Sequence, residues 1–149
     1  MLRSTLGCAI VAALVAFASP AAASDMTFRK ADATGLTDTV IGQPYWLLHA
    51  QCAGLFGARS QWELDAGRRE KAEEAKVQAV EFMHAALKRL QTDRGLDRKQ
   101  ALALAIPHLE AGRVHGKEIL ANGRTGWQSA WNAERSFCLD VRDAYRRRS

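Results

Sequence analysis

Cysteine and proline are scarce in this sequence: each occurs three times among 149 residues. No C-x-x-C or C-x-x-C-H motif is present, which excludes covalently attached c-type haem and argues against a thiolate metal site. Hydrolase and nucleotide-binding signatures are missing as well, namely Gly-x-Ser-x-Gly, His-Glu-x-x-His and a glycine-rich phosphate loop. These absences favour a non-enzymatic protein; an enzyme whose site is assembled from scattered residues is the alternative.

Strand patterns and long apolar runs are scarce too. The one alternating β-branched stretch is short, at residues 37–41, so the sequence does not predict a β-sheet. Beyond residue 18 no segment is apolar enough to cross a membrane, which takes about 20 apolar residues. The formal net charge of +5 is modest and basic residues do not interleave with aromatic ones, which argues against a nucleic-acid partner.

The N-terminus carries the three parts of a secretory signal peptide. Arg3 supplies a positive charge, residues 5–18 (TLGCAIVAALVAFA) form an apolar core, and residues 19–23 (SPAAA) are small, as signal peptidase requires. We therefore predict that residues 1–23 are cleaved; an uncleaved anchor is the alternative. The alanine- and arginine-rich composition is typical of bacteria, so the predicted location is periplasmic, or secreted.

Two cysteines remain after this cleavage, because Cys8 leaves with the signal peptide. Cys52 and Cys138 would then share an oxidising compartment, where disulfides form and persist. A bridge between them would close a long loop, which in the chain-entropy treatment stabilises the fold by about 4 to 5 kcal/mol. We predict a structural Cys52–Cys138 disulfide; a catalytic thiol or a metal ligand is the competing interpretation.

The rest of the chain divides into a lead-in and a helical domain. Residues 24–43 are predicted to be extended or partly disordered. Over residues 44–149, apolar residues recur at spacings of three and four, which is typical of helices with one buried face. The expected fold is all-α, a single-domain antiparallel bundle of about four helices.

The first helix is predicted over residues 45–62. Pro44 precedes it and suits a first helical turn, where the missing N–H costs nothing. One face is apolar and includes Cys52. Another face carries a stripe of small residues, namely Ala50, Ala53, Gly54 and Gly57. Such a stripe predicts that the backbone of a second helix packs closely against this one.

The second and third helices follow residue 66. The second is predicted over residues 67–91, with charged residues toward solvent and an alanine-rich apolar seam. The third opens at Asp97-x-x-Gln100, a capping-box pattern, and runs to about residue 121. Because a proline inside a helix removes a backbone hydrogen bond, we expect this helix to break near Pro107.

The last helix has the most regular pattern. It is predicted to open at Thr125 in a second capping-box sequence (TGWQ), and its apolar seam includes Trp127, Trp131 and Cys138. Cys52 and Cys138 thus lie on apolar faces of the first and last helices, as a buried disulfide between helices requires.

Four polar residues are the candidates for a metal site. Glu81 and His84 have the Glu-x-x-His spacing of dimetal bundles, and His108 and His115 are seven residues apart on one predicted helix. If they converged, they would suit zinc or copper. Non-covalent haem, bound through Met83 and a histidine of another helix, is the other cofactor alternative. The simpler interpretation is that the histidines form ordinary surface hydrogen bonds and that no cofactor is bound.

Two further features bear on partners. His49 and Gln51 flank the small-residue stripe and are the polar residues expected to border a groove, unless their role is structural. Arg142 and residues 146–148 form the one basic cluster. It suits the negative end of a terminal helix dipole; the alternative is an anchor for an anionic partner.

Together these patterns predict a small exported non-enzymatic protein, a binding or interaction module of the cell envelope. The expected partner is another envelope or secreted protein. The four tryptophans support this hypothesis, because tryptophan is over-represented at interaction hot spots. An inhibitor or immunity protein for a secreted hydrolase is one concrete version, and a metal- or haem-binding bundle is the competing hypothesis.

Overall fold

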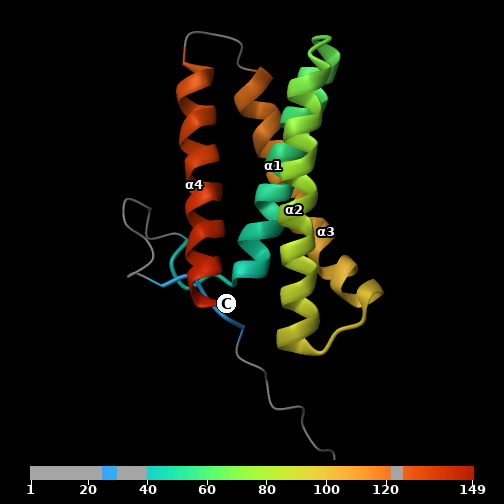
Figure 1. Cartoon of the computed structure of the whole chain (residues 1–149), viewed down its shortest axis with the longest axis vertical. Helices are drawn as coiled ribbons and strands as arrows, with labels where there is room; N and C mark the ends of the chain where they lie inside the picture. The colour runs from blue at the N-terminus through green and yellow to red at the C-terminus, as the bar shows by residue number, and fades with distance from the viewer. Residues whose placement is uncertain (1–24, 30–39, 122–125) are drawn as a thin grey trace, which may run out of the picture.

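The protein is an all-α bundle, as predicted. The computed structural model describes residues 25–29, 40–121 and 126–149 and contains four helices in this part of the chain. They are α1 (Tyr45–Asp65), α2 (Arg69–Arg94), α3 (Arg98–Ala121) and α4 (Trp127–Arg148). Successive helices run in opposite directions (Figure 1). The predicted signal peptide and the Thr125 cap lie outside the described residues.

Helix α1 is the central element of the bundle. It packs against α2 and α3 over much of its length, whereas α4 contacts it along a narrower seam (Figure 1). More than half of its residues are buried, on several faces, including the polar residues His49 and Glu63. A helix buried on several sides needs small residues where its neighbours come closest.

That close approach occurs between α1 and α3, as the small-residue stripe predicted. A Cβ atom added to Gly54 would overlap the carbonyl oxygen of Leu109 and lie 2.6 Å from the amide nitrogen of Arg113. Gly57 belongs to the same stripe but has nothing within 4 Å of such an atom. The prediction is therefore confirmed at Gly54 and wrong at Gly57.

Helix α3 supplies the other half of this contact. A Cβ added to Gly112 would overlap the carbonyl oxygen of Gln51, and one added to Gly116 would lie 2.9 Å from the Cβ of Ala58. The two backbones thus interlock through glycines on both helices. Gly112 and Gly116 were not predicted to take part.

The break expected near Pro107 is wrong. Helix α3 is continuous from Arg98 to Ala121 with Pro107 inside it. Both Pro107 and Ala103, whose carbonyl loses its helical partner, are exposed. Water can hydrate that carbonyl on the solvent side, so the proline does not end the helix.

The ends of α2 and α3 follow their sequence signals. Gly95 caps α2 in the left-handed conformation, with φ of 62°, which glycine adopts without steric cost. The predicted capping box is formed: the amide of Gln100 donates to Asp97 Oδ1 at 2.8 Å, and the amide of Asp97 donates to Gln100 Oε1 at 3.0 Å.

In the lead-in, residues 25–29 are extended and bonded to the start of the bundle, and residues 40–42 form a turn. The amide of Phe28 donates to the Gln43 carbonyl at 2.9 Å, and the Phe28 ring is fully buried. Asp25 accepts a hydrogen bond from Trp46 Nε1 at 3.1 Å and forms an ion pair with Arg94. The bond from Arg94 holds the pKa of the Asp25 carboxyl below its usual value.

Candidate binding cleft

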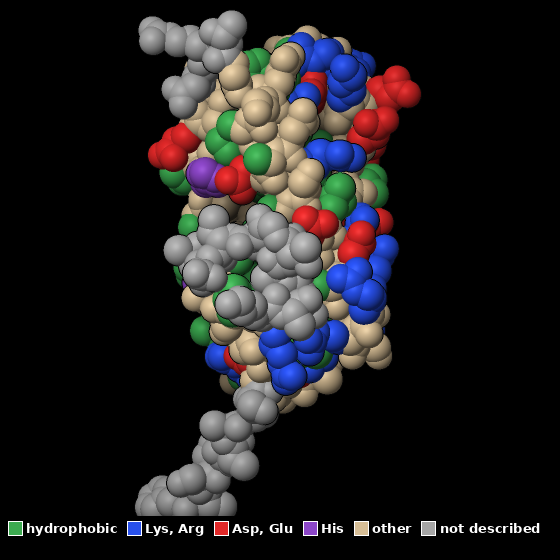
Figure 2. Space-filling model, turned by 90° about the vertical axis from the view of Figure 1, so that its left-hand side faces the viewer, with side chains coloured by type: hydrophobic (Ala, Val, Ile, Leu, Met, Phe, Trp, Pro, Cys, Tyr) green, Lys and Arg blue, Asp and Glu red, His purple; other side chains and the backbone are tan. Residues whose placement is uncertain are grey.

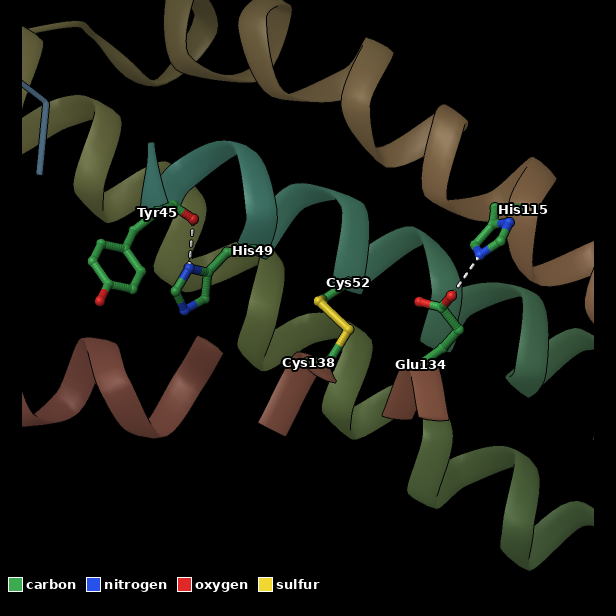
Figure 3. The surroundings of a disulfide bond; sticks show 6 residues. All are labelled: Tyr45, His49, Cys52, His115, Glu134 and Cys138. Atoms are coloured by element: carbon green, nitrogen blue, oxygen red, sulfur yellow. Dashed lines mark hydrogen bonds and ion pairs between the residues drawn. A yellow bond between two sulfur atoms is a disulfide. The ribbon is translucent and has the colours of Figure 1, made fainter. Parts of the chain in front are cut away.

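The predicted disulfide is present. Cys52 and Cys138 are bonded, their Cα atoms are 5.7 Å apart, and both side chains are buried (Figure 3). The bridge attaches the middle of α4 to α1. Helix α4 makes little direct contact with α2, and the space between these two helices is a cleft with α1 at its base.

The cleft contains two cavities. The first, which we call the Arg135 chamber, measures about 560 Å³ and lies between the N-terminal halves of α2 and α4. The second, the His49 chamber, measures about 450 Å³ and lies nearer the C-terminal ends of the same helices. Arg142 lines both. Its Nη1 donates to Gln78 Oε1 at 3.5 Å, across the cleft from α4 to α2.

Basic side chains outnumber acidic ones in the lining of the two chambers. The basic residues are Arg59, Lys71, Lys88, Arg135, Arg142 and Arg146, and the acidic residues are Glu63, Glu74 and Glu81. Figure 2 faces the α4 side of the molecule and shows basic groups gathered toward its upper and lower ends. A cleft with this balance of charge attracts anions.

The acidic residue Glu63 offsets Arg59 among the basic side chains of the lining, which leaves Lys71, Lys88, Arg135, Arg142 and Arg146 against Glu74 and Glu81. Its carboxylate is 1% exposed and forms ion pairs with both Arg59 and Arg68. The guanidinium of Arg59 also lies over the rings of Trp62, Trp127 and Trp131, at 4.8, 5.1 and 5.1 Å from the centroids. These cation–π contacts fix one end of the Arg135 chamber.

The four tryptophans are buried to different degrees. Trp46 and Trp131 are buried in the core, and Trp62 and Trp127 are half-buried beside Arg59. Packing therefore explains Trp46 and Trp131, whereas Trp62 and Trp127 stay partly accessible to solvent.

His49 borders the second chamber and is itself 1% exposed. Its Nδ1 lies 2.6 Å from the carbonyl oxygen of Tyr45, while the second ring nitrogen points away from that carbonyl (Figure 3). A carbonyl oxygen only accepts hydrogen bonds, so Nδ1 carries the proton. Nε2 is buried with no hydrogen-bond partner among the described residues.

Burial lowers the pKa of His49 to about 4, although the bond to the Tyr45 carbonyl partly opposes the shift. The ring is therefore neutral near pH 7. A neutral ring whose Nδ1 carries the proton has an unshared electron pair at Nε2, which accepts a hydrogen bond or binds a metal.

Gln51 does not share a groove with His49, contrary to the prediction. It lines a smaller cavity of about 160 Å³ between α1, α3 and α4, beside the disulfide. His115 lines the same cavity, with Nε2 3.0 Å from Glu134 Oε1 (Figure 3). His49 and Gln51 lie on different faces of α1, because two residues along a helix is about half a turn.

The four metal-site candidates are not brought together. Glu81 and His84 line the His49 chamber, His108 packs edge-on against Trp46 at 5.3 Å, and His115 pairs with Glu134. No group of three or more potential ligands that would hold a metal occurs in residues 25–29, 40–121 and 126–149. The convergence that the metal hypothesis required is therefore not found there.

Met83, the candidate haem ligand, lies on the opposite side of α2. It lines a separate cavity with Gly57, Val80 and Leu109, and no histidine is among the lining residues of that cavity. The pairing of Met83 with a histidine is therefore not supported by the geometry.

The burial of His49 leads to a prediction about acid stability. In the unfolded chain the imidazole titrates near pH 6.5, whereas in the folded protein it titrates near pH 4. Between these values the unfolded state binds a proton that the folded state does not. The free energy of unfolding should therefore fall by up to about 3 kcal/mol from pH 6.5 to pH 4 through this residue.

Urea unfolding at pH 7 and pH 4.5 would measure this effect. The His49→Phe variant keeps an aromatic ring and removes the titrating group, so it should lose less stability than the wild-type protein over this interval. Equal losses in the two proteins would show that His49 is not the cause.

None of the helices in the described part of the chain combines the length and hydropathy of a bilayer span. The disulfide is compatible with an extracytoplasmic protein. Comparison with known protein families, with curated proteins and with solved structures found no match to this chain. The function is therefore inferred from the cleft itself.

Proposed function

We propose that the protein is an exported non-enzymatic binding module, and that its α2–α4 cleft binds an acidic segment of another envelope or secreted protein. The excess of basic over acidic side chains lining the cleft is the observation that carries this proposal. The signal-like N-terminus and the disulfide support export to the periplasm or the medium. A secreted hydrolase inhibited by the module is one such partner.

A helical segment suits the shape of the cleft. Two parallel helices, α2 and α4, border it and α1 forms its base, so an amphipathic helix laid between them would bury its apolar face against Phe56 and Leu139. Glutamates on its polar face would meet Lys71 and Arg135 at the rim. Both rim side chains are exposed, so they favour the encounter and the choice of partner more than the final affinity.

Titration calorimetry with two synthetic amphipathic helices would test the proposal. The first peptide carries glutamates on its polar face and the second carries lysines at the same positions. We expect the acidic peptide to bind at least about tenfold more tightly, and its affinity to fall as salt is added.

The double variant Lys71→Glu and Arg135→Glu should lose this preference. Neither residue lines the His49 chamber, so that chamber is left intact. The matched control reverses the charge of Lys117, an exposed residue of α3 that lines neither chamber, and should bind like the wild-type protein. Equal affinity for the two peptides would contradict the proposal, and so would an equal loss of affinity for the acidic peptide in the double variant and in the Lys117 control.

A further inference from the structure

A groove lies between α2 and α3, on the side of α2 that faces away from the cleft. It measures about 400 Å³, and its walls include Val80 of α2 and Leu109 of α3. Its base is formed by small residues of α1, namely Ala53, Gly54 and Gly57. Among the described residues, those that line the groove all differ from those that line the two chambers. The groove is therefore a separate surface.

Exposed apolar side chains lie beside this groove. Val80 is 61% exposed, and Val77, one helical turn earlier on α2, is 47% exposed. On the opposite wall, Ile106 is 48% exposed and lies one turn before Leu109 on α3. We call the groove together with Val77, Val80, Ile106 and Leu109 the α2–α3 patch. Apolar side chains gathered on an exposed surface indicate a place where another molecule binds.

The polar side chains that line the groove already have partners. Ser60 Oγ donates to the carbonyl of Ala72 at 2.8 Å, and Gln61 Nε2 donates to Asp65 Oδ1 at 2.7 Å. The two basic side chains of the lining are held in ion pairs with glutamates of their own helices. A site for a small polar ligand needs polar groups that converge on the ligand. The patch instead suits the apolar surface of a protein.

The charges on the two walls are balanced. Lys76 lies 3.2 Å from Glu73 on α2, and Arg113 lies 2.7 Å from Glu110 on α3. Both pairs are accessible to solvent. A strongly acidic or strongly basic partner would gain little from such a rim. A second copy of this chain carries the same two pairs, so each basic side chain can meet a glutamate of the other copy.

We propose that the α2–α3 patch is the interface of a homodimer. The patch holds a ridge, Val77 and Val80, beside a hollow, and an interface with two-fold symmetry must be complementary to itself. The ridge of each copy would be buried in the hollow of the other. This inference goes beyond the proposed function and does not depend on an acidic partner. The dimer would leave the α2–α4 cleft open in both copies, and two linked clefts bind a repeated partner more tightly than one.

Sedimentation velocity over a series of protein concentrations would test this proposal. The disulfide-bonded protein, purified after export, should form a reversible dimer with a dissociation constant in the micromolar range, as an interface of modest area implies. Val80→Asp should weaken this dimer at least about tenfold, because the carboxylate would be buried in the apolar hollow of the other copy.

Leu104→Asp is the matched control. Leu104 is another exposed apolar residue, 39% exposed, and it lies on the far side of α3 from Ile106, because two residues along a helix is about half a turn. This variant should dimerise like the wild-type protein. Urea unfolding of the two variants would verify that each is folded.

A second measurement on the wild-type protein covers the case in which Val80→Asp does not fold. On dilution, the amide NMR signals of residues 76–83 and 106–113 should move, and those of α4 should stay in place. A protein that stays monomeric at every concentration would leave the patch to a different partner and would overturn the inference. A dimer that Val80→Asp leaves intact would overturn it too. The proposed function can fail separately, because its test depends on Lys71 and Arg135, which lie outside the patch.

Discussion

Removal of the Cys52–Cys138 bond is expected to lower the free energy of unfolding by about 4 to 5 kcal/mol. The two cysteines are 86 residues apart in sequence, and a crosslink that closes so long a loop strongly restricts the unfolded chain. The loss would be a large share of the roughly 5 to 15 kcal/mol that stabilises a typical domain.

The loss should also be uneven across the bundle. Helix α4 packs on α1 along a narrow seam and makes little contact with α2, whereas α1 packs extensively on both α2 and α3. Without the bridge, α4 should therefore exchange its amide hydrogens first, and the cleft that it borders should open.

Hydrogen exchange and urea unfolding would check both expectations. The double variant Cys52→Ala and Cys138→Ala would be compared with the wild-type chain from residue 24 onward, so that Cys8 does not interfere. Reductant should destabilise the wild-type protein and leave the double variant unchanged. Uniform faster exchange in all four helices would contradict the idea that α4 is the weakly attached element.

The sequence predicted those parts of the fold that depend on local spacing. The period of apolar residues placed Cys52 and Cys138 on inward faces, and the compartment suggested by the N-terminus made a bond between them the expected outcome. The Asp97–Gln100 capping box also formed as predicted, because it needs only residues of one helical turn. Pro107 failed as a break because its effect depends on which face of the helix meets solvent.

The site could be predicted less well, because it depends on how whole helices are rotated against one another. Spacing along a helix could not show that His84, His108 and His115 face different neighbours. The sequence pattern did single out His49, but as a residue that borders a groove together with Gln51. In the structure His49 borders the α2–α4 cleft, and Gln51 lines a different cavity. The basic lining of the cleft combines residues from three helices, and no local motif marks it.

The glycines between α1 and α3 allow the second large effect to be predicted. Gly112→Ala should lower the free energy of unfolding by about 3 kcal/mol or more, the upper end of what overpacking usually costs. The added methyl group would overlap the Gln51 carbonyl oxygen and lie 2.7 Å from its carbon. These are backbone atoms inside a helix, so no flexible side chain can move aside. The better helix propensity of alanine, worth about 1 kcal/mol, cannot compensate.

Gly57→Ala is the matched control, since the same substitution in α1 meets nothing within 4 Å. There the higher helix propensity should act alone and stabilise the protein by about 0.5 to 1 kcal/mol. Gly54→Ala should behave like Gly112→Ala, because it meets the Leu109 carbonyl from the other side of the same contact. Urea unfolding of the three variants measures the change in the free energy of unfolding. If α1 and α3 pack backbone to backbone, this free energy should fall in Gly112→Ala and Gly54→Ala and rise in Gly57→Ala. Stabilisation by all three would mean that the two helices lie farther apart than the structure places them.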